Sequence, residues 1–435
     1  MRTARKPLPR AWLYWLIGNG FTRMPRLLTA ARIKAEEPVV RTEGAAGGFE
    51  YSDAYLHDND ARFVFNFVRS ALSRGCIAAN YVSSEGARRD GDRWVLSAHD
   101  QVADERFEIQ ADVLINAAGP WVDQHNALTG QQTEHRHLFS KGIHLIVDRF
   151  SESERVLTFF ADDGRLFFAI PMGNRCCIGT TDTQVDSPDV EISDADRDYV
   201  LDNINRRLDL PVPLTHADVI EERCGVRPLV VAGGQQGFDD FLQLSRKHAV
   251  DVNAAARHVS IFGGKLTDCI NVGEEICEVV RGLGVTLSHP AFRWYGEPPD
   301  TVRDEFWHQA RLMDLDGYTA PESSEPLSQR LWRRYGAQAI GLLENIREDP
   351  REAEVLIKGT EYIRCELRQA ARREMIVTLE DFLRRRSKIA LVEHDTVIRA
   401  APGLREACEI LFGAEQAEAK IAEYFDQPAA PDDPL

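Results

Sequence analysis

The sequence predicts a mixed fold of the α/β plus α+β class, followed by an all-helical domain. An apolar run over residues 113–115 stops on an Ala-Ala-Gly-Pro turn, the pattern of a buried strand that ends at a ligand-binding edge. Between residues 156 and 181, strand-like runs are separated by Asp-Gly and Gly-Asn pairs, which favour an antiparallel meander. Beyond Asp300 the apolar residues recur at helical spacing.

Length and composition limit the class of protein. The 435 residues suffice for two or three domains, and contents of 43% hydrophobic and 28% charged residues are ordinary for a globular protein. The net charge of −17 argues against nonspecific binding to nucleic acids. An Arg-Arg-Arg run at residues 384–386 falls inside an expected amphipathic helix, where a solvated or inter-domain face explains it better. We therefore expect no nucleic-acid partner.

The pattern divides the chain into four segments. Residues 1–47 form a basic N-terminal segment, and residues 48–287 combine the α/β layer with the meander. A proline-marked linker at residues 288–300 then leads into a helical domain over residues 301–425. Residues 426–435 form a tail that we expect to be disordered.

Local patterns assign the elements of the second segment in order. Residues 60–75 favour a helix, and residues 93–100 and 107–116 favour strands. From His144 to about Val230 the signal is that of a β structure. The stretch that begins at Gly263 opens a helix whose apolar residues fall roughly on one face.

The first 35 residues contain eight basic and no acidic residues. Within them, AWLYWLI at residues 11–17 is too short to span a bilayer. Contact with a membrane surface and burial in the fold are the two alternatives for this run. The eight cysteines form no CxxC pair, so we expect reduced thiols in a cytoplasmic protein and no metal site.

Eight stretches in a fixed order resemble the FAD-dependent glycerol-3-phosphate dehydrogenases, the membrane-associated and quinone-linked kind. They run from about Gly48 to Lys388 and include part of the helical domain. The stretches are GFEYSDAYLHDNDARFV, INAAGPWVD, KGIHLIV, FFAIPMGNRCCIGTTDT, GVRPLV, the pair Ser245-Arg246, FGGKLTD and TLEDFLRRRSK.

This resemblance implies an amino-acid-oxidase-like FAD fold in which an antiparallel sheet binds the substrate and residues 48–287 form the flavoprotein domain. It implies that glycerol 3-phosphate is oxidised to dihydroxyacetone phosphate and that the reduced flavin passes electrons to a quinone. The residues that it assigns to FAD are Ala117, Ala118, Gly119, Gly263, Gly264, Leu266 and Thr267.

The resemblance also assigns residues to the substrate. Arg227 and Arg246 would be substrate-facing cations, because the planar fork of arginine binds phosphate oxygens bidentately. Lys265 follows two glycines at an expected helix N-terminus, where negative charge is favoured. His144 is the candidate for proton transfer. The alternatives are structural salt bridges for the arginines, a plain helix entry at Lys265 and an ordinary strand residue at His144.

Two features depart from the family pattern. The family commonly reads GGKLTTYR, whereas this chain has Asp268-Cys269-Ile270 after Thr267, and the added carboxylate would disfavour a nearby phosphate. The family also opens with a GxGxxG unit, and the nearest imitation here, at Gly18-Asn19-Gly20, has Arg23 in place of the third glycine.

We therefore expect an incomplete FAD-dependent oxidoreductase fold that lacks the N-terminal FAD-binding unit and is inactive alone. The missing portion could be encoded upstream, be omitted by a wrong start or be supplied by a complementing chain, and a homodimer is a further possible assembly. If active, the protein would lie in the cytoplasm or at the inner face of the cytoplasmic membrane. Two other hypotheses remain: a non-catalytic remnant or interaction module, and a flavin oxidase of amines or amino acids.

Overall fold

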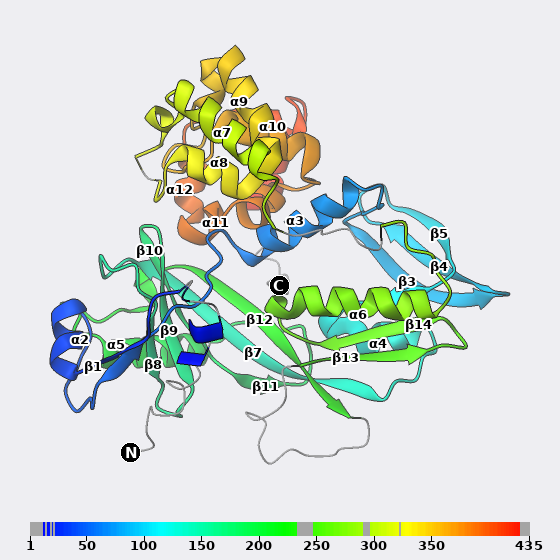
Figure 1. The fold of residues 1–435 in the computed structure, drawn as a ribbon, viewed down its shortest axis with the longest axis horizontal. Coiled ribbons are helices and arrows are strands. Elements are labelled where there is room, and N and C mark those ends of the chain that lie inside the picture. Colours follow the sequence, from blue (N-terminus) through cyan, green and yellow to red (C-terminus); the bar gives the residue numbers. More distant parts are fainter. Residues whose placement is uncertain are drawn as a thin grey trace.

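The protein is described by a computed structural model, which covers residues 12, 13, 15–17, 20, 22–232, 247–289, 296–321 and 323–426. Figure 1 shows two sheet-bearing lobes beneath a helical domain. One lobe carries a large antiparallel sheet, and the other carries a small layer with a parallel strand pair and a separate three-stranded sheet. The α/β plus α+β class and the C-terminal helical domain predicted from the sequence are thus confirmed.

The small layer contains the strand that the sequence predicts before the Ala-Ala-Gly-Pro turn. Strand β6 (Leu114–Asn116) pairs in parallel with β14 (His258–Gly263), and β13 (His248–Asn253) pairs with β14 in antiparallel orientation. Helices α4 (Val122–Leu128) and α6 (Cys269–Gly282) follow β6 and β14. Because β6 and β14 are parallel, the turns that follow them lie at the same edge of the layer.

Strand β6 is buried on one face, whereas the sequence suggested a fully buried strand. Leu114 and Asn116 are buried, and the Asn116 amide donates to the Val122 carbonyl at 2.9 Å and to Asn126 Oδ1 at 2.8 Å. Ile115 on the other face is 40% exposed. The difference arises because the described residues cover the α4 side of this short strand more fully than the opposite side.

The three-stranded sheet stands beside this layer and is antiparallel. It consists of β3 (Val82–Asp90), β4 (Arg93–Asp100) and β5 (Glu105–Ala111). The buried Trp94 connects it to the β13–β14 turn, because its indole N–H donates to the Ala256 carbonyl at 2.8 Å. This contact fixes the sheet against the parallel strand pair.

The large antiparallel sheet is organised around the long strand β7 (His135–Asp148). Strand β12 (Val219–Ala232) pairs with β7 along one side, while β11 and β10 pair with different parts of its other side. The other strands are β8 (Leu157–Phe160), β9 (Leu166–Met172), β10 (Arg175–Gly179) and β11 (Thr183–Val185). Strands β8, β9 and β10 form the predicted antiparallel meander.

A helix interrupts the region that the sequence marks as continuously β. Helix α5 (Asp194–Arg207) begins with a capping box between Ser193 and Asp196 and packs Val200 and Ile204 into the core beneath β7. The β prediction was wrong here because α5 carries charged residues over most of its surface, so its apolar signal is weak. The other face of β7 is left for the helical domain and the candidate site.

The C-terminal domain consists of short helices around two apolar clusters. The α-helices are α7 (Asp300–Leu312), α8 (Leu327–Tyr335), α9 (Ala339–Glu348), α10 (Arg364–Arg373), α11 (Ile389–Val392), α12 (Asp395–Ala400), α13 (Leu404–Phe412) and α14 (Ala417–Phe425). The Arg-Arg-Arg run lies in the π-helix η8 (Asp381–Arg386), not in the expected α-helix. Arg384 pairs with Glu221 at 3.0 Å, so the inter-domain explanation of the run applies to this residue.

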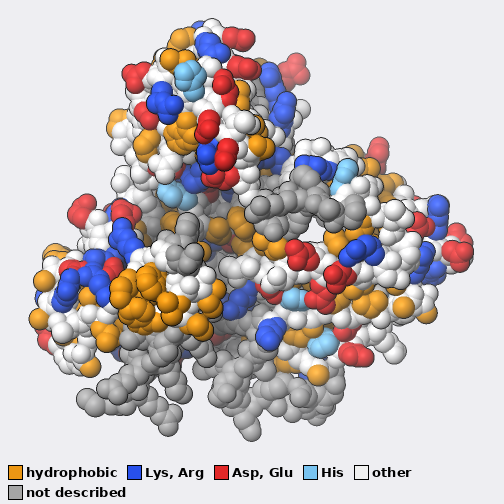
Figure 2. All heavy atoms as spheres, in the orientation of Figure 1, with side chains coloured by type: hydrophobic (Ala, Val, Ile, Leu, Met, Phe, Trp, Pro, Cys, Tyr) orange, Lys and Arg blue, Asp and Glu red, His pale blue; other side chains and the backbone are white. Residues whose placement is uncertain are grey.

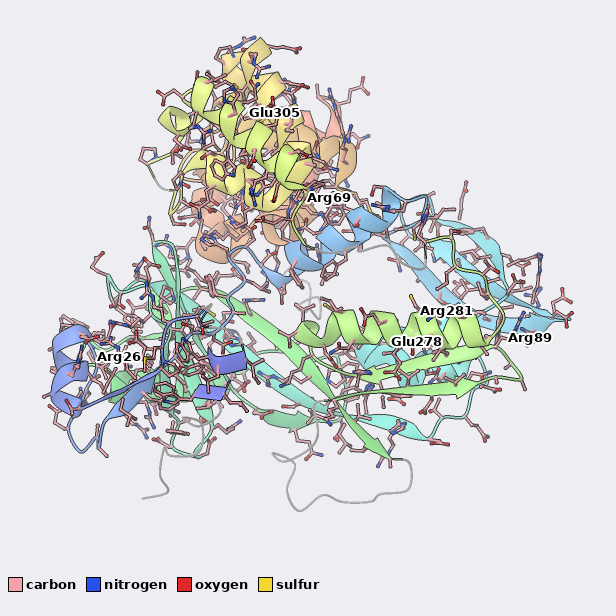
Figure 3. All side chains as sticks on the ribbon, in the orientation of Figure 1. Arg26, Arg69, Arg89, Glu278, Arg281 and Glu305 are labelled. Atoms are coloured by element: carbon pink, nitrogen blue, oxygen red, sulfur yellow. The ribbon has the colours of Figure 1, made fainter. Side chains whose placement is uncertain are left out.

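Helix α3 (Asp60–Leu72) joins the two halves of the molecule and runs along the base of the helical domain (Figure 1). Just before it, the Asn59 amide donates to the carbonyls of Arg384 and Ser387 at 2.8 and 3.0 Å. Arg69, near its end, lies at the junction with the helical domain (Figure 3) and donates to the Arg334 carbonyl at 3.2 Å. The start of α3 is therefore held above the large sheet.

The N-terminal segment packs against the large-sheet lobe. Strands β1 (Arg26–Leu28) and β2 (Gly48–Glu50) form a small antiparallel pair, and α2 (Ala30–Glu36) lies between them in sequence. Figure 2 shows hydrophobic side chains gathered on the surface of this lobe. In the part of the chain that the structure describes, we find no helix with the length and apolar character needed to cross a membrane.

Candidate active site

Two glycine-containing turns lie at the shared edge of β6 and β14. After β6, Gly119 has a φ of +56°, and a Cβ there would meet no atom within 4 Å. After β14, Gly263 and Gly264 have φ values of +60° and +93°. Positive φ favours glycine because other residues are strained in this region. Both turns therefore present bare backbone, which is suited to close approach by a ligand.

The first turn contains three of the seven residues that the resemblance assigns to FAD. Ala117 and Ala118 are exposed, and the Ala118 N–H donates to Asn116 Oδ1 at 3.2 Å. Gly119 begins the short helix η1 (Gly119–Trp121), which leads into α4. The turn is thus anchored from the strand side and open on its outer side.

The second turn lies directly on the large sheet. The Gly263 N–H donates to His137 Nε2 of β7 at 2.9 Å, and a Cβ on Gly263 would collide with Val230 of β12. Lys265, Leu266 and Thr267 follow as exposed residues at the start of η4 (Leu266–Asp268). Because η1 also packs against β12 and β14, both turns meet the large sheet at the same place.

Asp268, the departure from the family pattern, has compensating partners. Its carboxylate accepts from His248 Nδ1 at 2.6 Å and from the Asn271 amide at 2.6 Å. The other ring nitrogen of His248 lies 2.9 Å from Glu275 Oε2, and hydrogen bonds to the two carboxylates raise the pKa of His248. The hydrogen bond from Asn271, followed by that from His248, lowers the pKa of Asp268. The extra negative charge is therefore partly neutralised within the turn, which weakens the expected repulsion of a phosphate.

The substrate-side residues lie on one face of the large sheet. In the β7–β12 register, His144 is opposite Arg223, Gly142 is opposite Gly225, and Ser140 is opposite Arg227. Directly paired residues of antiparallel strands point to the same face. The pairing thus brings His144 and Arg227 onto one face, although they are far apart in the sequence.

Arg227 lies across the backbone of Gly142. A Cβ on Gly142 would be 2.6 Å from Arg227 Cζ, so only glycine leaves room for the guanidinium in this position. Arg227 donates to Thr180 Oγ1 at 3.0 Å and to the Thr181 carbonyl at 3.3 Å, and its Nη1 lies 3.7 Å from Asp182 Oδ1. These contacts orient a guanidinium whose side chain remains 28% exposed.

His144 is held in its neutral form. Burial lowers its pKa to about 3, and the positive charges of Arg223 and Arg227 act in the same direction. At neutral pH the imidazole is therefore uncharged, and a pKa this low also makes it a weak base. Within the described residues, neither ring nitrogen of His144 makes a protein hydrogen bond.

The structure does not bring every predicted residue together. Arg246 lies outside the described residues. Arg223, Gly142 and the Thr180–Asp182 segment were missed by the sequence analysis. Their one local signal is the alternation in RCGVR, which puts Arg223 on the same strand face as Arg227. Within the described residues, no group of three or more His, Cys, Asp or Glu side chains could hold a metal ion.

Comparison with known proteins assigns the chain to a family. The model of the FAD-dependent oxidoreductases matches residues 4–254, which is more than half of the chain. The chain belongs to the FAD-dependent oxidoreductase family. A second model, the C-terminal domain of alpha-glycerophosphate oxidase, matches residues 305–419 of this family member.

Curated relatives extend over most of this FAD-dependent oxidoreductase. Glycerol-3-phosphate dehydrogenase 2 of Mycobacterium tuberculosis is 28% identical over 454 aligned positions, which cover 97% of this chain and 74% of the relative. Aerobic glycerol-3-phosphate dehydrogenase of Staphylococcus aureus is 27% identical over 387 positions, covering 86% and 67% of the two chains.

A solved structure shows the same fold. The glycerol-3-phosphate dehydrogenase of Bacillus halodurans, complexed with FAD, superposes with a TM-score of 0.68 at 24% identity. The match covers 96% of this chain and 84% of that one. The resemblance in sheets and helical domain therefore extends through nearly the whole oxidoreductase chain.

Proposed function

We propose that the chain holds FAD at the two turns, oxidises sn-glycerol 3-phosphate to dihydroxyacetone phosphate, and passes the electrons to a quinone. One observation carries the proposal: Arg227 and His144 share one face of the large sheet, and both turns contact β12, the strand that carries Arg227. The relatives named glycerol-3-phosphate dehydrogenase favour the same substrate. Arg246, which lies outside the described residues, is a further proposed substrate contact.

FAD, when bound, supplies the acceptor for the hydride that leaves C2 of the substrate. The residues of the chain perform the other tasks. Arg227 can bind two phosphate oxygens through its planar fork and remains charged at all relevant pH values. His144 is the proposed acceptor of the C2 hydroxyl proton, so that loss of one hydride and one proton leaves the ketone. Because burial lowers the pKa of His144 to about 3, we infer that an anionic substrate bound beside it raises this pKa for the transfer. Lys265 adds positive charge where the anionic groups bind.

The open backbone of the turns fits a flat cofactor with an anionic group. The proposed FAD contacts are either exposed residues or glycines of the two turns and are Ala117, Ala118, Gly119, Gly263, Gly264, Leu266 and Thr267. We infer that tight binding also needs a pyrophosphate-binding unit from a complementing chain, because the 435 residues contain no recognisable glycine fingerprint and a second copy would lack it as well. Without it we expect no turnover.

Flavin absorbance of the purified chain tests this inference. We expect less than stoichiometric FAD in the protein alone and a rise when a fingerprint-bearing partner is added. Stoichiometric flavin and turnover by the isolated chain would contradict the need for a second chain. They would leave the proposed reaction intact.

Peripheral contact with the inner face of the cytoplasmic membrane is part of the proposal. Leu13, Leu16 and Ile17 are 54%, 63% and 71% exposed, and they follow a basic stretch that would attract anionic lipids. Sedimentation with anionic and neutral vesicles measures this contact. Negligible binding to both kinds of vesicle would contradict the proposed membrane contact.

Substitution of Arg227 tests the substrate assignment. In FAD-loaded protein, Arg227→Ala is expected to lower kcat/KM for glycerol 3-phosphate by about 100-fold, because phosphate binding and orientation are both lost. Arg227→Lys should recover only part of this loss, since lysine lacks the fork. Arg206→Ala is the matched control, because Arg206 is 57% exposed and pairs with Asp162 on the opposite side of the sheet. Equal kinetics for the Arg227→Ala and Arg206→Ala variants would exclude Arg227 from the site.

A further inference from the structure

We propose that Arg223, anchored by Asp60 of α3, is a second anion-binding guanidinium of this site and also positions His144 as a neutral base. The inference rests on the proposed function and adds a residue that the sequence motifs do not mark. The ligand that it would bind with Arg227 is a small phosphate monoester.

The strand register puts Arg223 in the site. Arg223 is opposite His144, and Arg227 lies four residues further along the same strand, so both arginines point to the same face. Between them Gly225 contributes no side chain, and a Cβ there would meet nothing within 4 Å. No side chain of Gly225 therefore covers the sheet surface between the two arginines.

The hydrogen bonds of Arg223 leave donors available. Its Nη2 donates to both carboxylate oxygens of Asp60, at 3.1 and 3.2 Å. Its Nε is buried without a hydrogen-bond partner, and within the described residues its Nη1 makes no hydrogen bond. A buried donor without a partner is costly, and a bound phosphate oxygen could satisfy it after a small movement of the side chain. The side chain is 22% exposed, so it is reachable from solvent.

Asp60 provides a rigid anchor for this arginine. It is the first residue of α3, where the helix dipole favours a carboxylate, and its Oδ1 also accepts from the Ala61 N–H at 3.1 Å. Asn59 immediately before it is fixed to the helical domain through Arg384 and Ser387. Nη2 of Arg223 is therefore held through α3. Among the residues that the structure describes, no oxygen accepts a hydrogen bond from its Nε or Nη1.

Arg223 also acts on His144. The charged groups that influence this imidazole are Arg223 and Arg227 on β12 and Asp60 on α3. The two guanidinium groups disfavour the imidazolium, while Asp60 opposes them. Removal of the Arg223 charge should therefore raise the pKa of His144. Loss of packing would also raise it by exposing the imidazole to water, so Arg223→Lys, which keeps the charge, separates the two effects.

The experiment combines two readouts on the full chain. Calorimetry with sn-glycerol 3-phosphate, and with inorganic phosphate as the simplest probe, measures affinity in the presence of FAD. NMR titration of labelled histidines, with the His144 signal assigned by a His144→Asn variant, measures its protonation without any need for turnover. The variants are Arg223→Gln, Arg223→Lys and Arg227→Ala, with Arg206→Gln as the control on α5.

We expect Arg223→Gln to weaken glycerol 3-phosphate binding at least tenfold and to raise the His144 pKa by one unit or more. Arg223→Lys should keep the low pKa but recover only part of the affinity. Weakened binding in Arg227→Ala with wild-type affinity in Arg223→Gln would overturn the role of Arg223 and leave the proposed function standing. Wild-type affinity in both would overturn both. An unchanged His144 pKa in Arg223→Gln would overturn the positioning role whatever the affinities.

Discussion

Two arginine clusters of this molecule differ in how far their donors are satisfied. In the helical domain, Arg334 is 1% exposed and donates to Asp58, Glu361 and Glu366 at 2.9, 2.7 and 3.1 Å. It also donates to the Tyr362 hydroxyl at 3.1 Å. On the large sheet, Arg223 and Arg227 are 22% and 28% exposed, and Arg223 retains N–H groups without protein partners.

The difference separates the structural role of Arg334 from the binding role that we propose for Arg223 and Arg227. A buried guanidinium surrounded by carboxylates has no capacity for a ligand and can only hold its neighbours in place. Arg223 and Arg227 are only partly buried, and they lie on either side of Gly225, which has no side chain to cover the sheet surface between them. Because Asp58 and Asp60 lie on either side of Asn59, the structural cluster also fixes the carboxylate that anchors Arg223.

The largest expected effect comes from disrupting the cluster of Arg334 with Asp58, Glu361 and Glu366 in the helical domain. Arg334→Ala should lower the free energy of unfolding by about 3–5 kcal/mol, because it leaves buried carboxylates without their partner. Urea denaturation measures this loss. Arg405→Ala is the control, since Arg405 is 68% exposed and its removal should change stability by no more than about 0.5 kcal/mol. Similar stabilities for the two variants would refute the distinction between the clusters.

A substitution with a smaller expected effect should move the Arg227 side chain without unfolding the protein. Gly142→Ala introduces a Cβ where the Arg227 guanidinium now lies, and the flexible side chain can swing away. We expect glycerol 3-phosphate binding to weaken about tenfold while the free energy of unfolding changes by less than about 1 kcal/mol. Calorimetry and urea denaturation check the two parts. Gly341→Ala, on an uncrowded position of α9, should leave binding unchanged.

The next prediction concerns the loss of stability at acid pH that arises from His144, which lies opposite Arg223. The pKa of His144 is about 3 in the folded chain and has its ordinary value of 6.5 in the unfolded chain, so the unfolded chain binds the extra proton between these values. Its contribution to stability is therefore complete above pH 6.5 and is lost as the pH falls towards 3, at up to about 1.4 kcal/mol per pH unit. Unfolding experiments from pH 7 to pH 4 should show a shallower decline in His144→Gln than in the parent. Parallel curves would mean that His144 is not buried in its neutral form.

The smallest effect concerns the second turn. The pKa of His248 is raised by Glu275 and Asp268, so the stabilising charge is fully present below pH 6.5 and is lost as pH rises through the folded pKa. Since the Glu275 side chain is 49% exposed, solvent screening limits the contribution to a few tenths of a kcal/mol. Thermal unfolding between pH 6 and 9 should show less alkaline loss in His248→Asn. If His248→Asn loses as much stability at alkaline pH as the parent does, the pairing of His248 with Glu275 and Asp268 is not the cause of that loss.

The sequence predicted the parts of the fold that depend on local chemistry. The strand before Gly119, the β8–β10 meander and the helical C-terminal domain follow from apolar runs, turn pairs and helical spacing. Helix α5 escaped prediction because its apolar residues are few, and residues 381–386 form a π-helix that no local pattern in the sequence marks. Resemblance to known motifs indicated His144 and Arg227 but not their partners.

By itself, the sequence determined which residue types are available: glycine-containing turns, an arginine that we propose to bind phosphate, and a titratable histidine. Only the tertiary structure decided that His144 and Arg227 share a face, that Arg223 lies beside them, and that His248 compensates Asp268. The physical reason is that strand register and long-range ion pairs join segments distant in the chain. Local propensities carry no information about which of these segments will meet.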